Sequence, residues 1–341
     1  MDERTSWRIV ILGKTGAGKS SLANTLLGEN VFNISHSPIT DPSLSCAKTK
    51  SVNGKSIELI DTPSFFDTGG SEELLKAEIV RCITECAPGP HAFLIVLKVE
   101  KFTEHEKDVI KKICQSFSEE ALKYATVVFT HGDQLEEGGT IEEFVSQNGG
   151  LSDLVKKCGG RCHVVDNKYW KNSQEDDYRS NQFQVAELLD TLEKMIEANK
   201  GSCYTNEMLQ AVKKEIQTEE EHIRQSSVNM SQEEIRNKAK NSVFNKLLTR
   251  VASTATGALL GALLGVLKMG VAIVCNYRSD PTALVSAVRG AAGSAALSGV
   301  VTGGKIGYDA AEGAQSPKEA VEKTIKGLLK YSGVAEDKNN K

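Results

Sequence analysis

Several features that would place the chain in a common functional class are missing from its sequence. Lysine and arginine together number 41 against 45 aspartate and glutamate residues, so the net charge is −4 at pH 7. The chain therefore lacks the basic excess of a typical nucleic-acid-binding protein, and we expect no nucleic-acid partner. None of the eight cysteines forms a Cys-x-x-Cys pair, and no histidine cluster completes a zinc site. We expect reduced thiols rather than disulfides or a structural metal.

Targeting signals are also missing. The start of the chain has no basic stretch followed by an apolar run, so we expect no secretory export. Asp2 occupies the position where N-myristoylation requires glycine, and no cysteine stands at the end for prenylation. The chain is expected to be cytoplasmic. Its 341 residues, 40% hydrophobic and 25% charged, suggest two domains or one domain with an extension.

Residues 1–200 alternate between strand-like and helix-like segments. Continuous apolar runs are typical of strands buried on both faces in a parallel sheet. Asn53-Gly54 between two strand-like runs predicts a β-hairpin. The alternation predicts an α/β domain with a doubly wound, mostly parallel sheet and one antiparallel edge strand. Strands are expected at 8–12, 47–52, 57–60, 92–99, 125–130 and 161–165, and helices at 19–27, 71–86, 103–117, 141–157 and 181–199.

The segment between the first strand and the first helix carries the strongest motif. It matches G-x-x-x-x-G-K-[ST] in full, from Gly13 to Ser20. Glycines let backbone N–H groups surround phosphate oxygens, and the helix N-terminus adds partial positive charge. We expect Lys19 to reach the β- and γ-phosphates and Ser20 to offer its hydroxyl to Mg²⁺. The phosphate-binding residues expected here are Gly13, Lys14, Thr15, Gly16, Ala17, Gly18, Lys19 and Ser20.

Polar residues after three other strands complete the expected nucleotide site. Asp61 ends an apolar strand, where its carboxylate could face Mg²⁺ through water. Asp133 follows the strand 125–130 and could accept both the N1–H and N2–H of guanine, a donor pair that adenine lacks. His131 could stack on the base edge, and Asn167, after the strand 161–165, could contact the purine. Together these residues favour guanine.

In this order, the motifs GKTGAGKSS, DTP-x-FFDT, PHAFLIVLKVEKFTEHE and VFTHGD, with an asparagine after the next strand, resemble the GTPases of immunity-associated proteins. These belong to the septin–Toc-like P-loop GTPases, and the resemblance covers residues 6–200. It implies binding of GTP and GDP with Mg²⁺, GTP-dependent dimerisation through the nucleotide face, and frequent C-terminal attachment to intracellular membranes. By this resemblance the nucleotide contacts are residues 13–21 (Ser21 included), Ser35, His131, Gly132, Asp133 and Asn167.

The chain departs from the family pattern near the γ-phosphate. Phe65 stands where Ras-like enzymes place a glutamine that orients water, so intrinsic hydrolysis is expected to be slow. Lys101 replaces a common arginine. It keeps the charge for a catalytic contact across a dimer but loses the planar fork. Thr40 and Ser43 both provide a hydroxyl that could bind Mg²⁺ in the switch I loop.

These features lead to competing hypotheses. The first is a guanine-nucleotide-binding GTPase switch whose slow hydrolysis depends on dimerisation. The alternative is a membrane-tethered scaffold that binds GTP for assembly with little or no hydrolysis. An ATP-dependent small-molecule kinase is a third hypothesis, but it would need a phosphate-clamping lid and no guanine reader.

The composition changes after Gly201. Residues 201–250 are expected to form a charged helical extension, a solvated helix or weak coiled coil. Residues 251–314 are expected to form a Gly/Ala-rich hydrophobic hairpin, and residues 315–341 an amphipathic helix and tail. The run 251–275 is long enough to span a bilayer. Residues 251–304 could insert in a membrane, pack as a hairpin on themselves or the GTPase domain, or bind a partner.

Overall fold

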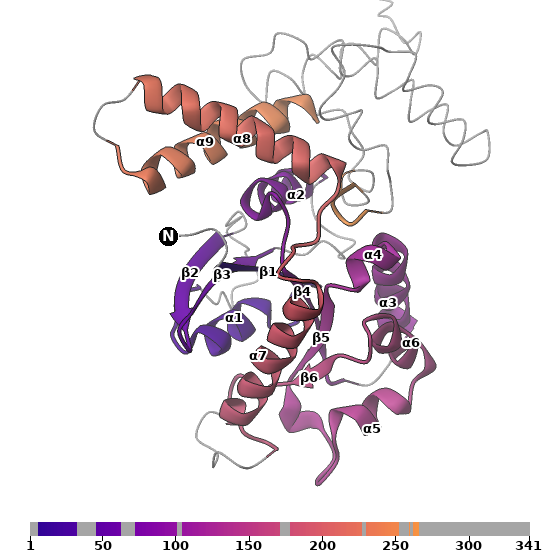
Figure 1. The fold of residues 1–341 in the computed structure, drawn as a ribbon. Helices are drawn as coiled ribbons and strands as arrows, with labels where there is room; N and C mark the ends of the chain where they lie inside the picture. Colours follow the sequence, from indigo (N-terminus) through magenta and orange to yellow (C-terminus); the bar gives the residue numbers. More distant parts are fainter. Residues whose placement is uncertain are drawn as a thin grey trace, which may run out of the picture.

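A six-stranded sheet organises the protein, in the strand order β2-β3-β1-β4-β5-β6 (Figure 1). The computed structural model describes residues 6–32, 46–62, 72–100, 104–170, 178–226, 230–251, 259 and 262–265. All strand pairs are parallel except β2 with β3, which confirms the predicted fold class. The strands are β1 (Ser6–Gly13), β2 (Cys46–Val52), β3 (Lys55–Asp61), β4 (Ala92–Lys98), β5 (Ala125–Thr130) and β6 (Cys162–Val164).

Helices cover both faces of the sheet because its central strands are apolar on both sides. Along β1, Ile9 and Ile11 pack with α1 and α7, whereas Val10 and Leu12 pack in the core that contains α2 and α3. Figure 1 shows α1 and α7 together on one side of the sheet. The helices of the first 200 residues are α1 (Lys19–Leu27), α2 (Glu72–Cys86), α3 (Glu104–Ser116), α4 (Glu119–Leu122), α5 (Ile141–Ser146), α6 (Gly149–Lys157) and α7 (Asn181–Ala198).

Two local features show how closely the sequence specifies this fold. Asn53 and Gly54 both have positive φ, 50° and 77°, as the predicted tight hairpin between β2 and β3 requires. The single helix predicted over 141–157 is wrong, because the structure has α5 and α6 with a break between them. The first helix ends at Ser146, and Asn148 caps the second, since its side chain accepts a hydrogen bond from the Leu151 N–H.

The segment after Gly201 forms two helices, α8 (Glu207–Ser226) and α9 (Gln232–Arg250). The helical prediction holds, but the expectation of a solvated helix is wrong. Apolar side chains at three- and four-residue spacing, such as Val212 and Ile216, are buried in the same core as α2. Lys240 on α9 also reaches into this interface and pairs with Glu85 of α2 at 2.9 Å. The charges surrounding the apolar positions concealed this inward face in the sequence.

The described part of the apolar run 251–275 lies inside the fold. Leu259, Leu263 and Leu264 are at most 1% exposed. The Leu264 carbonyl accepts a hydrogen bond from the Ser118 N–H, and the Asn206 side chain donates to the Leu263 carbonyl. For these residues the structure favours the packed alternative.

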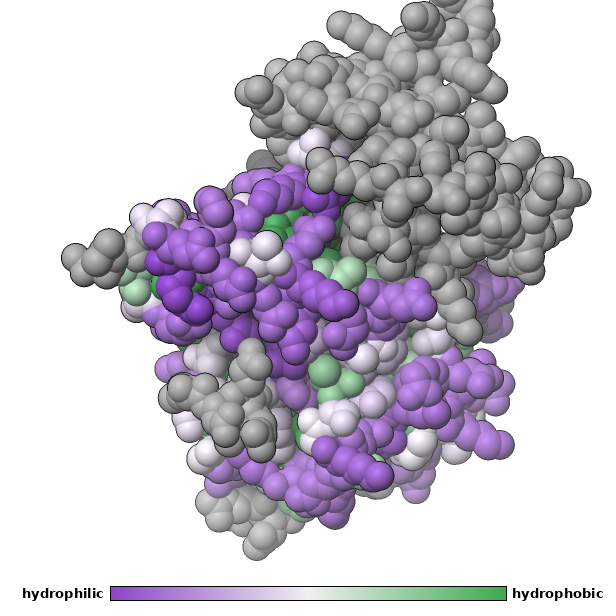
Figure 2. All heavy atoms as spheres, turned by 45° about the horizontal axis from the view of Figure 1, so that its top comes forward, coloured by the Kyte–Doolittle hydropathy of each residue, from purple (hydrophilic) through white to green (hydrophobic). Residues whose placement is uncertain are grey.

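The described surface seen in Figure 2 is mostly polar. Hydrophilic side chains cover most of it in Figure 2, and hydrophobic atoms show only in small patches. Within the described residues, no helix is both long and apolar enough to cross a membrane. The second apolar run at 282–304 and the expected last helix at 315–341 lie outside the described residues.

Candidate functional site

The predicted phosphate loop lies between β1 and α1, at the carboxyl edge of the sheet. Gly16 and Gly18 have φ values of 71° and 84°, which side-chain-bearing residues rarely adopt. Gly13 is required for a different reason, because a Cβ atom there would lie 2.6 Å from the Val96 carbonyl oxygen. Gly18 also caps the N-terminus of α1, so backbone N–H groups and the helix dipole face the same point.

Lys19 is the buried cation of this loop, with 8% of the residue exposed. Its ammonium donates to the carbonyl oxygens of Gly13 and Lys14 at 3.1 and 3.0 Å. Both acceptors belong to the loop itself, which therefore folds around a positive charge. An anion in the loop would meet this ammonium together with the α1 N-terminus.

Ser20 and Asp61 bring two oxygen donors together at the same edge. The Ser20 hydroxyl donates to Asp61 Oδ2 at 2.5 Å. The other carboxylate oxygen, Asp61 Oδ1, is buried and has no hydrogen-bond partner among the described residues. Burial raises the pKa of Asp61, although the Ser20 hydroxyl and the Lys19 ammonium oppose this. A buried carboxylate oxygen without a partner, beside a hydroxyl, fits a hard cation such as Mg²⁺.

Two hydrogen bonds tie the phosphate loop to the strands that carry the expected base-reading residues. The Thr130 hydroxyl at the end of β5 donates to the Ala17 carbonyl at 2.8 Å. The Thr25 hydroxyl on α1 donates to Asn167 Oδ1 at 2.8 Å. The Asn167 side-chain oxygen is thus engaged with α1, and the predicted contact of Asn167 with a purine stays a prediction.

His131 and Gly132 begin the 3₁₀ turn η2 (Gly132–Gln134) directly after β5. His131 is exposed and has a φ of 60°, uncommon for a residue with a side chain. Its ring nitrogen lies 3.0 Å from the Thr130 hydroxyl. Gly132 lies against the buried Trp170, because a Cβ there would come within 2.4 Å of the indole ring. The buried Trp170 ring therefore packs against the turn at Gly132, and the His131 side chain is exposed to solvent.

Asp133 and Asp166 lie beside this turn, at the ends of the neighbouring strands β5 and β6. The Gln134 side-chain amide donates to Asp133 Oδ2 at 2.6 Å. Asp166 accepts N–H groups from Lys168, at 2.9 Å, and from Tyr169. Burial and the Asp166 carboxyl raise the pKa of Asp133, while the backbone N–H groups lower the pKa of Asp166 despite its burial.

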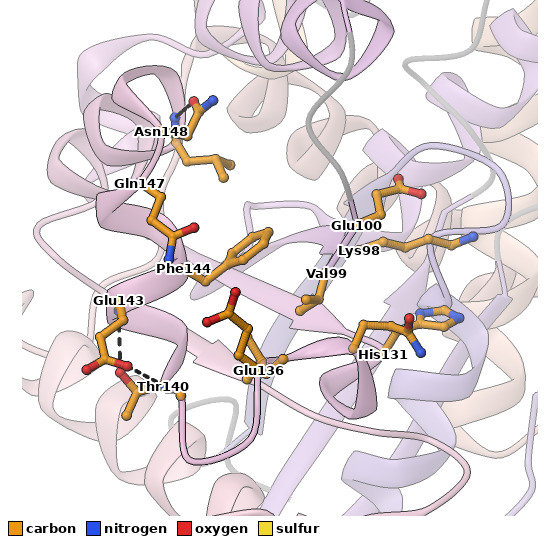
Figure 3. A pocket seen from close by; sticks show the side chains of 14 residues that line it. Lys98, Val99, Glu100, His131, Glu136, Thr140, Glu143, Phe144, Gln147 and Asn148 are labelled. Carbon is orange, nitrogen blue, oxygen red and sulfur yellow. Dashed lines mark hydrogen bonds between the residues drawn. The ribbon is translucent and has the colours of Figure 1, made fainter.

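A groove of about 690 Å³ opens next to His131, between the end of β4 and the helices α5 and α6 (Figure 3). Phe144 and Glu136 point into it, whereas Glu143 turns back to cap α5 with Thr140. Glu100 on its rim forms an ion pair with Lys14 of the phosphate loop at 2.7 Å. The groove leaves open space beside the His131 side chain.

The structure brings together most of the predicted site residues. Residues 13–21, Asp61, residues 131–133 and Asn167 all lie at the carboxyl edge of the sheet. Predicted residues from the intervening loops lie outside the described residues: Ser35, Thr40, Ser43, Phe65 and Lys101.

The sequence analysis missed three contributors to the site. Thr130 and Asp166 immediately precede residues that it selected, so their positions at the ends of strands gave a usable signal. The pairing of Glu100 with Lys14 joins residues 86 positions apart, and no local pattern predicts it.

The phosphate-loop region and the segments that follow it match a family model described as AIG1 over residues 7–224. The mouse (Mus musculus) GTPase IMAP family member 8 is 34% identical over 51% of this chain and 26% of its own length. Immune-associated nucleotide-binding protein 8 of Arabidopsis thaliana is 34% identical over 61% of this chain and 58% of its own length. The chain thus spans only a quarter to three fifths of these two relatives. Protein 7 of the same Arabidopsis group is 30% identical over 68% of this chain and 75% of its own length.

A solved structure of Arabidopsis thaliana Toc33 in complex with GDP and Mg²⁺ has 22% sequence identity and a TM-score of 0.42. It covers 56% of this chain and 84% of that chain.

Proposed function

The chain belongs to the AIG1 family, and from this premise we propose that it is a guanine-nucleotide-binding GTPase that takes GTP and GDP with Mg²⁺ at the carboxyl edge of its sheet. The observation that carries the proposal is the phosphate loop with its buried Lys19 ammonium, set beside the Ser20–Asp61 pair. The names of the mouse and Arabidopsis relatives, a GTPase and nucleotide-binding proteins, support the same assignment.

The residues at the carboxyl edge of the sheet divide the binding of phosphates and cation among them. Lys19 exchanges the two loop carbonyls for β- and γ-phosphate oxygens, and the backbone N–H groups around Gly16 and Gly18 surround those oxygens. Ser20 and Asp61 would hold the cation with the Ser20 hydroxyl and the Asp61 carboxylate. Mg²⁺, when bound, neutralises negative charge on the phosphates. The hydrogen bond from the Thr130 hydroxyl to the Ala17 carbonyl fixes the phosphate loop relative to the base-reading turn η2.

The base is read at η2 and after β6. Asp133 accepts the N1–H and N2–H of guanine, and the exposed His131 ring stacks against the purine. Adenine presents an acceptor at N1 and no 2-amino group, so Asp133 selects against ATP. The ATP-dependent kinase hypothesis is therefore disfavoured.

Hydrolysis is proposed to be slow and to depend on a GTP-dependent homodimer, with Lys101 of one subunit approaching the phosphates of the other. Phe65 supplies no polar group to orient water. The measurement is GTP turnover per subunit as a function of protein concentration. We expect turnover to rise with concentration, Lys101→Ala to abolish the rise, and Lys101→Arg to restore it. Turnover that stays negligible while GTP binding persists would favour the assembly-scaffold alternative.

Attachment to an intracellular membrane is proposed for the C-terminal apolar region. The buried Leu259, Leu263 and Leu264 stay packed in the fold and do not take part in it. Floatation of the full chain with liposomes tests this proposal. A protein that stays out of the lipid fraction with both GTP and GDP would contradict it.

The nucleotide assignment is tested by two lysines of one loop. Lys19→Ala should weaken GDP binding by at least about 30-fold, because it removes the buried phosphate-facing cation. Lys14→Ala is the matched control, since Lys14 pairs with Glu100 and should change affinity by only a few-fold. Equal losses in both variants, or none in Lys19→Ala, would contradict the assignment.

A further inference from the structure

The loop after β6 holds the backbone of Asn167 on both sides. Just before it, the Asp166 N–H donates to Asn181 Oδ1 at 3.1 Å, and Asn181 Nδ2 donates to the Asp166 carbonyl at 2.6 Å. Just after it, the Lys168 and Tyr169 N–H groups donate to Asp166 Oδ1, the first of them at 2.9 Å. These neighbours fix where Asn167 lies, and another contact decides how its side-chain amide is turned.

Thr25 on α1 makes that contact. Its hydroxyl donates to Asn167 Oδ1 at 2.8 Å, although the two residues are 142 positions apart in the sequence. Because this bond occupies the amide oxygen, Nδ2 is the atom that the half-buried Asn167 offers to a ligand. Nδ2 lies against the phosphate loop, since a Cβ atom on Gly18 would come within 3.4 Å of it. The side chain therefore presents a donor at the nucleotide edge.

Other helical threonines of the chain use their hydroxyls differently from Thr25. Thr84, Thr218 and Thr249 each donate to the carbonyl four residues earlier in their own helix, a common partner of a helical threonine. Leu22 on α1 is fully buried in the core that α1 shares with α7, which fixes the rotation of α1. The core thus places the Thr25 hydroxyl where it binds the loop after β6.

The orientation of an asparagine amide decides which purine it can accept. Guanine carries an oxygen at position 6, which accepts a hydrogen bond, whereas adenine carries an amino group there, which donates one. An asparagine that turns freely can offer its N–H to guanine or its oxygen to adenine. An asparagine whose oxygen is already bound offers only its N–H, so that adenine would set a donor against a donor.

We propose that Thr25 is a positioning residue for base selection: its hydroxyl holds Asn167 with Nδ2 toward the base, where Nδ2 donates to guanine O6. Asp133 takes the N1–H and N2–H of the ring, and Asn167 takes the neighbouring O6. The two residues together cover the edge on which guanine and adenine differ. The proposal rests on the function proposed above, and it gives α1 a part in base selection besides its N-terminal contact with phosphate.

The test uses two GDP analogues that each change one position of the base. In 6-thio-GDP a sulfur, which is a weaker hydrogen-bond acceptor, replaces O6, and IDP lacks the 2-amino group that Asp133 is proposed to bind. Dissociation constants for GDP and both analogues are measured on the full chain with Mg²⁺, by displacement of a fluorescent GDP. We expect the native protein to bind GDP at least about fivefold more tightly than 6-thio-GDP, the effect of weakening one hydrogen bond.

Thr25→Val keeps the shape of the side chain and removes its hydroxyl. We expect its preference for GDP over 6-thio-GDP to fall to about twofold or less, while its preference for GDP over IDP stays at the native value. Thr25→Ser keeps the hydroxyl and should behave like the native protein. Thr218→Val, which removes a hydroxyl bonded within α8, is the matched control and should also leave both preferences unchanged. If Thr25→Val does not fold, Thr25→Ala takes its place.

The outcomes separate the two proposals. Absence of GDP binding to the native protein would overturn the proposed function. Tight GDP binding with the same preference over 6-thio-GDP in native protein and Thr25→Val would overturn the role of Thr25 alone. A general weakening of all three nucleotides in Thr25→Val, with both preferences intact, would do the same, because it would reduce Thr25 to a structural residue.

Discussion

At the amino ends of β1 and β4, Arg8 and His91 are joined by two hydrogen bonds, one to the Arg8 carbonyl and one to the His91 ring. At the carboxyl ends of the same sheet, Asp61 keeps a buried oxygen without a partner among the described residues. The Arg8 N–H donates to His91 Nδ1 at 2.9 Å, and the Arg8 side chain donates to the Gly89 carbonyl at 2.9 Å. At the carboxyl edge, Lys19 binds carbonyls of its own loop. One end of the sheet is closed by its own contacts, and the other has groups arranged for a ligand.

The amino end is also where the chain after residue 200 is attached. The Tyr204 N–H donates to the Pro90 carbonyl at 2.8 Å, and the Tyr204 ring packs edge-on against Phe93 with centroids 5.5 Å apart. A Cβ on Gly265 would lie 2.4 Å from the Tyr204 hydroxyl, so the docked apolar segment reaches the same place. The comparison therefore predicts that substitutions at the amino end change stability, and that substitutions at the carboxyl edge change binding.

The largest expected effect comes from Leu263, which is fully buried. Leu263→Lys should lower the free energy of unfolding by about 4 kcal/mol or more, because it buries a charge in an apolar site and leaves a packing defect. Urea unfolding followed by circular dichroism measures the change. A variant as stable as the native protein would show that this segment is not part of the folded core in solution.

The second prediction concerns the pH dependence of stability at the amino end. Burial and the Arg8 guanidinium lower the pKa of His91 to about 4, against about 6.5 in an unfolded chain. Because the folded state disfavours the protonated ring, this contribution is fully present above pH 6.5 and is lost as the pH falls toward 4. Between pH 7 and pH 5 the loss should be about 2 kcal/mol.

His91→Asn, which keeps an acceptor for the Arg8 N–H, should remove most of that loss. Equal pH dependence in native protein and variant would assign the loss to other groups. His163, whose pKa burial also lowers to about 4, is the next candidate.

The smallest expected effect concerns Asp61 at the carboxyl edge, and it raises the free energy of unfolding instead of lowering it. Asp61→Ala should raise the free energy of unfolding of the nucleotide-free protein by about 1 kcal/mol, because it removes a buried carboxylate oxygen that lacks a partner. The same variant should lose the strengthening of GTP binding by Mg²⁺. A destabilised variant that still responds to Mg²⁺ would mean that Asp61 has a structural role instead.

The sequence predicts the carboxyl edge better than the rest of the molecule, and the reason is local chemistry. The bounds of α1 and β5 are as predicted, because Gly28 ends the helix and an uninterrupted apolar run defines the strand. The inward face of α8 and α9 was missed, since its apolar residues are separated by many charges and become meaningful only against α2. The ion pair between Lys14 and Glu100 was missed because it joins residues far apart in the sequence.

The central claim is that the carboxyl edge is a guanine-nucleotide site, and competition binding tests it most directly. Displacement of a fluorescent GDP from the full chain, in the presence of Mg²⁺, is measured with unlabelled GDP and with ATP. The account predicts displacement by GDP at concentrations at least about tenfold lower than by ATP, and loss of that preference in Asp133→Asn. Equal displacement by both nucleotides in the native protein, or no binding of the fluorescent GDP, would contradict it.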